Sequence, residues 1–140
     1  MLKLIAILGM LLGVSACAGQ HATVPFSAAL RGDLSDAPEI EVSGNVDTTG
    51  INFYSLIDSA AGIGSSECIP LILTGADQRR ARQLHGRPVV VRGRVMGLAD
   101  IFRLLPEHIG LVNGREWTGT HCEGAIALFV THLVPENRRP

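Results

Sequence analysis

Two stretches of this chain alternate apolar and polar residues one by one, a pattern typical of half-buried β-strands. In the first, Ile40, Val42, Gly44 and Val46 alternate with polar side chains, and residues 88–96 repeat the pattern around a run of valines. Successive side chains of a strand point to opposite faces of a sheet, so each stretch has one face to bury. The chain is therefore expected to fold as a mainly β domain.

Three further strands are predicted from shorter apolar runs. Residues 52–58 and 68–73 are rich in aromatic and aliphatic side chains, although Pro70 places the second run at a sheet edge or a bulge. Residues 125–134 are apolar on both faces over most of their length, which favours a central strand.

One helix is predicted between the third and fourth of these strands, starting near residue 75 and ending at Leu84 or His85. Thr74 and Asp77 have the spacing of a capping box, Ala81 and Leu84 would face inward, and Gly86 would stop the helix.

The order strand, strand, strand, helix, strand, irregular segment, strand resembles the OB-fold, a small five-stranded β-barrel with one short helix between strands three and four. The matching segments are 42–46, 53–58, 84–95 and 125–134, and Gly44 and Gly93 suit strands that bend sharply. Residues 97–124, with a hairpin turn expected at Asn113-Gly114, are longer than a usual link between the last two strands. The sequence therefore does not establish that the barrel closes, and another small β-barrel or β-sandwich is the alternative.

The amino terminus resembles the signal of bacterial lipoproteins. Lys3 precedes an apolar run from Leu4 to Val14, and Val14-Ser15-Ala16-Cys17 matches the lipobox of that family. The run is too short to span a bilayer as a helix, which needs about 20 residues, but it suits a secretory signal. The resemblance implies that residues 1–16 are removed, that Cys17 is lipidated, and that the protein is held at the outer membrane, because Ala18 and Gly19 rather than aspartate follow. An ordinary signal peptide cut near Ala16 or Ala18 is the alternative.

The predicted mature chain has a tether, one domain and a tail. Residues 17–38 show no periodicity and are expected to be a flexible tether, on which Phe26 and Leu30 could contact the domain at 39–135; residues 136–140 form a disordered polar tail. One of the twelve cations, Lys3, leaves with the signal, so eleven arginines face thirteen acids. The resulting net charge of about −2 gives no general attraction to nucleic acid.

The two remaining cysteines, Cys68 and Cys122, are expected to form a disulfide in the oxidising envelope. The segment His121-Cys122-Glu123 suggests an alternative in which Cys122 is a reactive thiol or a metal ligand. The further metal ligands would be Cys68, His108 and His132, but no metal-ligand spacing is present. No catalytic motif, metal or cofactor is predicted.

The remaining candidate for a functional site is a basic segment, in which six arginines fall within sixteen residues. Arg79, Arg80, Arg87, Arg92 and Arg94 are the candidate ligand-binding residues, with Arg82 between them. Arginine binds phosphate and carboxylate through a planar fork. The alternative is an ordinary solvated face.

Two functional hypotheses follow. The first is a non-catalytic binding or scaffolding module, lipid-anchored at the periplasmic face of the outer membrane, whose partner is an envelope protein, an anionic glycan or a lipid headgroup. The second is a thiol- or metal-dependent periplasmic enzyme that uses the His121-Cys122 region.

Overall fold

The computed structural model describes residues 21–34, 36–49, 54–97 and 122–137 of the 140-residue chain. The elements are β1 (His21–Thr23), α1 (Phe26–Arg31), β2 (Glu39–Asp47), β3 (Ser55–Ile57), β4 (Cys68–Ile72), α2 (Gly75–Gln83), β5 (Pro88–Gly97) and β6 (Ile126–Pro135). The hairpin expected at Asn113-Gly114 lies outside the described residues.

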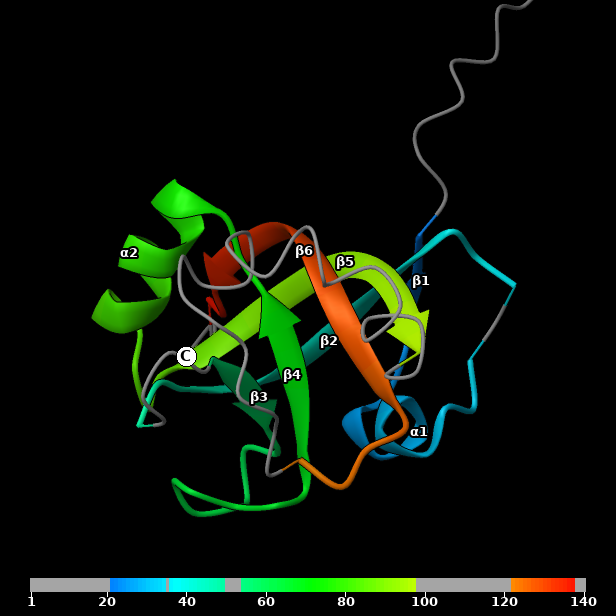
Figure 1. The fold of residues 1–140 in the computed structure, drawn as a ribbon, viewed down its shortest axis with the longest axis horizontal. Helices are drawn as coiled ribbons and strands as arrows, with labels where there is room; N and C mark the ends of the chain where they lie inside the picture. Colours follow the sequence, from blue (N-terminus) through cyan, green and yellow to red (C-terminus); the bar gives the residue numbers. More distant parts are fainter. Residues whose placement is uncertain (1–20, 35, 50–53, 98–121, 138–140) are drawn as a thin grey trace, which may run out of the picture.

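Strands β2–β3–β4–β6–β5 form a closed barrel, because β5 pairs back with β2, and β1 lies beside β2 as an extra strand (Figure 1). β4 and β6 run parallel, and the other barrel neighbours are antiparallel. The predicted five-stranded barrel with a short helix between its third and fourth strands is confirmed. The β2–β5 pairing closes the barrel, so the sandwich alternative is wrong.

The barrel interior is filled by the apolar members of the alternating stretches. Ile40, Val42 and Val46 from β2 and Val89 and Val91 from β5 are completely buried. Burying such a side chain contributes about 1.5–3 kcal/mol relative to leaving it in water. β6 pairs with β4 on one side and β5 on the other, as its two apolar faces predicted.

Gly44 and Gly93 lie where neighbouring strands approach too closely for a side chain. A Cβ at position 44 would lie 2.5 Å from the carbonyl oxygen of Ile57, and one at position 93 would lie 2.7 Å from that of Phe129. The register of β5 and β6 shifts next to Gly93, so β6 carries one extra residue there. These glycines are therefore required by close approach of backbones.

Pro70 does not lie at an edge, contrary to the sequence prediction, because β4 pairs with β3 and with β6. Its ring is tolerated for a geometric reason. The amide of Leu71 donates to the carbonyl of Tyr54 at 2.9 Å, so the pair next to it, Pro70 and Ser55, is a non-hydrogen-bonded pair. The missing N–H of Pro70 therefore removes no bond to β3.

The predicted flexible tether is wrong for much of its length. Residues 21–23 form β1 parallel to β2, and α1 buries Phe26 and Ala29 while Leu30 packs partly against the core. An element of six residues is too short to show a helical period, which explains why no pattern in the sequence indicated it. At the other end, the amide of Glu136 still donates to the carbonyl of Pro88.

α2 agrees with the prediction in its position and differs in its cap. Ala81 and Leu84 are buried as expected, and Gly86 has the left-handed conformation, with φ of 70°. The Thr74 side chain makes no cap hydrogen bond; its carbonyl instead accepts from the amides of Asp77 and Gln78. No helix in the described part of the chain is long and apolar enough to cross a membrane.

Candidate functional site

The disulfide joins the start of β4 to the segment that leads into β6. Cys68 and Cys122 are bonded, with their Cα atoms 4.9 Å apart, and both pack with Ile57 in a small buried cluster outside the main core. This is the predicted pairing, and it points to an oxidising, extracytoplasmic location.

The bonded sulfurs leave neither cysteine as a free thiol, the form that nucleophilic or metal chemistry requires. His108 and His121, the nearest partners in the enzyme hypothesis, lie outside the described residues. Within the described ranges, no three His, Cys, Asp or Glu side chains gather in a way that could hold a metal ion. Among the residues that the structure describes, no such set of side chains surrounds Cys122.

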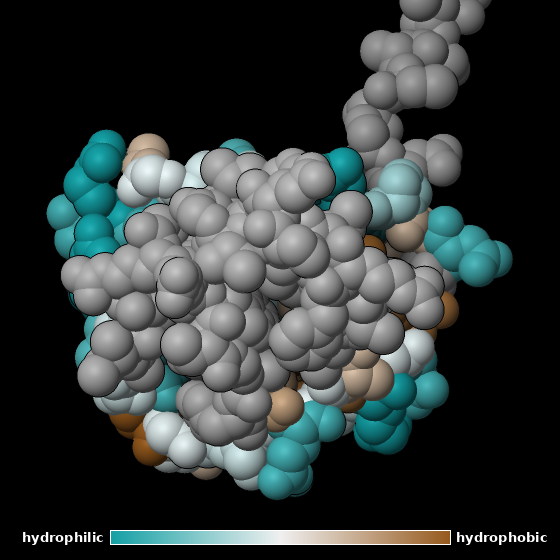
Figure 2. Space-filling view, viewed as in Figure 1, coloured by the Kyte–Doolittle hydropathy of each residue, from teal (hydrophilic) through white to brown (hydrophobic). Residues whose placement is uncertain are grey.

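Arginines gather on α2 and on the turn that follows it. Ala81 faces the core, so the neighbouring positions of the helix are directed outward, and Arg79, Arg80, Arg82 and Arg87 are all exposed. We call these four residues the arginine surface. Figure 2 shows hydrophilic residues over the upper left of the molecule, where Figure 1 places α2.

Two members of the arginine surface also fasten α2 to the barrel. Arg80 donates from Nη1 to the carbonyl oxygen of Leu133 at 3.1 Å, and Arg82 donates from Nη1 to the hydroxyl of Tyr54 at 2.6 Å. Each bond uses one of the five N–H groups of a guanidinium and leaves its charge in place. Arg79 and Arg87 are consequently the residues best suited to test the surface without loosening the helix.

No ion pair among the described residues includes a member of the arginine surface, although Glu136 lies near Arg87 through its bond to the Pro88 carbonyl. The ion pairs among these residues are His21–Glu41, Arg31–Asp33 and Arg92–Glu41. Asp77 in the first turn of α2 is the one acid within residues 74–87. Four arginines and one aspartate leave a local charge of about +3.

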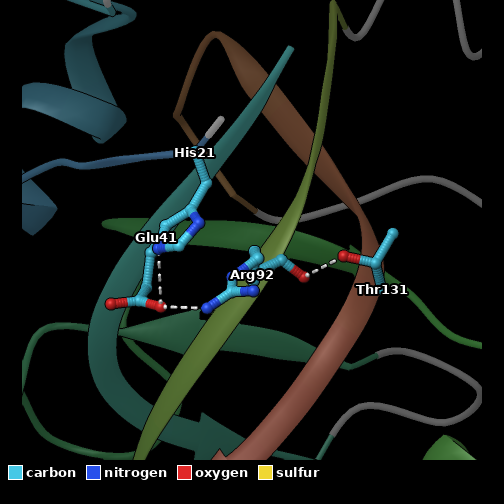
Figure 3. A network of polar contacts seen from close by, with 4 residues as sticks. All are labelled: His21, Glu41, Arg92 and Thr131. Carbon is cyan, nitrogen blue, oxygen red and sulfur yellow. Dashed lines mark hydrogen bonds and ion pairs between the residues drawn. The ribbon is translucent and has the colours of Figure 1, made fainter. Parts of the chain in front are cut away.

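Arg92, on the outer side of β5, is already neutralised. Its Nη2 lies 3.0 Å from Oε2 of Glu41 on β2, and His21 Nε2 lies 3.5 Å from the same oxygen (Figure 3). The Thr131 hydroxyl donates to the Arg92 carbonyl at 3.3 Å. The Arg92 side chain therefore links β5 to β2, and Glu41 links both to His21 on β1; the buried Nε of Arg92 has no partner.

Arg94 is exposed, and its guanidinium carbon lies 4.8 Å from the centre of the Phe129 ring, a cation–π contact. It is seven residues beyond Arg87 along a strand, roughly 23 Å at 3.3 Å per residue. The structure thus separates the five predicted arginines: Arg79, Arg80 and Arg87 lie together with Arg82, whereas Arg92 and Arg94 lie apart from them.

Asp47 forms a buried polar cluster that the sequence analysis missed. The residue as a whole is 2% exposed, and its carboxylate accepts hydrogen bonds from the amide and hydroxyl of Thr49 and from the amide of Gly64. Burial raises the pKa of Asp47, but these hydrogen bonds and nearby His85 outweigh that effect and hold the pKa below its ordinary value. The cluster fixes the loop before β4; the Asp-Thr-Thr-Gly turn was the available signal.

None of the family models, curated proteins and solved structures that were compared matches this chain. The site must therefore be interpreted from its own geometry, in which the arginine surface is the largest group of described arginines without an acidic partner.

Proposed function

We propose that this protein is a lipid-anchored, extracytoplasmic binding module without catalytic activity, and that it binds an anionic ligand through the arginine surface. Lipidation at Cys17 and retention at the periplasmic face of the outer membrane are part of the proposal. The lipobox-like Val14-Ser15-Ala16-Cys17 supports the anchor, and Ala18-Gly19 after the cysteine supports the outer membrane. The disulfide supports export.

The observation that carries the binding role is the absence of an acidic partner at the four arginines, judged over the described residues. Arg31, by contrast, is paired with Asp33 at 2.9 Å. Guanidinium groups without an acidic partner can bind phosphates or carboxylates bidentately. A cluster with a charge of about +3 would also attract such a ligand over about 8 Å at physiological salt.

Retention on a polyanion matrix tests the binding role. The variant Arg79→Glu/Arg87→Glu should elute at clearly lower salt than the unmodified protein. Arg31→Glu/Arg94→Glu is the matched control, because it changes the net charge equally but outside the arginine surface. Equal losses in the two variants would show that only net charge matters and would refute a binding surface on α2.

A further inference from the structure

The docking of β1 brings the barrel close to the proposed lipid attachment. β1 pairs with β2, the amide of Val24 donates to the Glu41 carbonyl at 2.9 Å, and His21 contacts the Glu41 carboxylate. Only Ala18, Gly19 and Gln20 separate Cys17 from His21. Four residue steps span at most about 14 Å when fully extended, so a lipid on Cys17 would hold the barrel against the membrane surface.

Charge is distributed unevenly between the two ends of the barrel. β4 and β6 run parallel, so their starts lie at one end and their ends at the other. Near the starts lie Asp58, Glu67 and Glu123, together with Asp33 in its ion pair with Arg31, because α1 contacts Gly124 there and the loop 58–67 leads into β4. α2 lies at the opposite end, where Arg80 bonds to the carbonyl of Leu133.

The start of β1 and the turn after α2 lie at opposite ends of β2, because His21 pairs with Glu39 whereas the amide of Gly86 donates to the carbonyl of Val46. In Figure 1 the start of β1 and α2 both lie toward the upper edge of the view, whereas α1 and the loop before β4 lie toward the lower edge. A flat surface that meets both must therefore extend along the length of β2, and α1 and the loop before β4 then lie on the side away from it.

We propose that the arginine surface rests on the anionic phosphate headgroups of the same membrane that holds the lipid anchor. This inference rests on the proposed anchor and names the anionic ligand of the proposed function. A lipid chain combined with a basic patch gives far more stable attachment than either alone, because the two contacts reinforce each other. Two acids near the contact would be repelled by anionic headgroups: Asp77, and Glu39, which is the cross-strand partner of His21. The four arginines still outnumber them.

Vesicle binding by the whole mature chain with Cys17→Ser, prepared without signal or acyl groups, tests the contact without the anchor. Vesicles of phosphatidylcholine with about one third phosphatidylglycerol are compared with phosphatidylcholine alone, at low and physiological salt. Each arginine near an anionic surface contributes about fivefold to binding, so Arg79→Gln/Arg87→Gln should weaken binding to the anionic vesicles about 30-fold.

The control Arg31→Glu has the same net charge, lies on α1 away from the arginine surface, and should change binding less than threefold, with folding checked by the disulfide and strand content. Equal weakening in both variants, equal binding to neutral vesicles, or no vesicle binding by the unsubstituted chain would each overturn the inference. If the chain binds the polyanion matrix through Arg79 and Arg87 but ignores the vesicles, the proposed function stands and the ligand is an envelope protein or glycan instead.

Discussion

Replacing Gly44 with alanine tests whether the barrel closes as described, because the new methyl group has no room. Its carbon would lie 2.5 Å from the carbonyl oxygen of Ile57 and 2.9 Å from Cγ of Leu56. The first of these atoms is backbone in the paired strand β3, so relief requires the two strands to move apart. Overpacking of this kind costs about 1–3 kcal/mol of unfolding free energy.

For a barrel of about 100 residues, that loss corresponds to a fall in melting temperature of roughly 4–24 °C. Thermal unfolding followed by circular dichroism, with the disulfide intact, measures it. Gly62→Ala is the matched control, because no atom lies within 4 Å of a Cβ there and its φ is not left-handed. If Gly44→Ala melts at the same temperature as Gly62→Ala, the close approach of β2 and β3 is wrong.

Three other substitutions test the contacts around the site. Cys122→Ser should lower the unfolding free energy by up to about 4 kcal/mol in thermal melts, because the bond closes a loop with a sequence separation of 54 residues; an unchanged melt would contradict a structural role. Asp47→Asn should reduce the fall of the unfolding free energy at acidic pH, measured by urea unfolding at a series of pH values. A carboxyl whose folded pKa is depressed stabilises the fold above its unfolded pKa of about 3.9 and loses that contribution as the pH falls through the folded pKa. The same fall of unfolding free energy in the variant and the unmodified protein would refute this. Glu41→Gln should speed hydrogen exchange at the amides of 22–24, while those of β6 keep their rates, since Glu41 holds His21 and Arg92; unchanged rates at 22–24 would count against the network in Figure 3.

The alternating strands were predictable because burial of one face imposes a period of two on the sequence. Ile40, Val42 and Val91 carry that signal directly, and the doubly apolar β6 carries the signal of a central strand. Elements without such a period were not predictable. β1 and α1 depend on contacts with β2 and with Gly124, which lie far away in sequence.

In the candidate site, too, some features were predictable from the sequence and others were not. The cysteine pair followed from export and residue count, and the outward direction of Arg79 followed from the helical spacing of Ala81 and Leu84. The neutralisation of Arg92 did not follow, because Glu41 meets it only through the pairing of β2 with β5. Strand pairing over fifty residues is tertiary information that no local pattern contains.

Intact-mass analysis of the protein purified from membranes tests the central claim most directly. The account predicts a chain that begins at Cys17, carries thioether- and amide-linked acyl groups at that residue, and is lighter by two hydrogens for the Cys68–Cys122 bond. A chain that begins at another residue, or that begins at Cys17 without acyl groups, would contradict the anchored module.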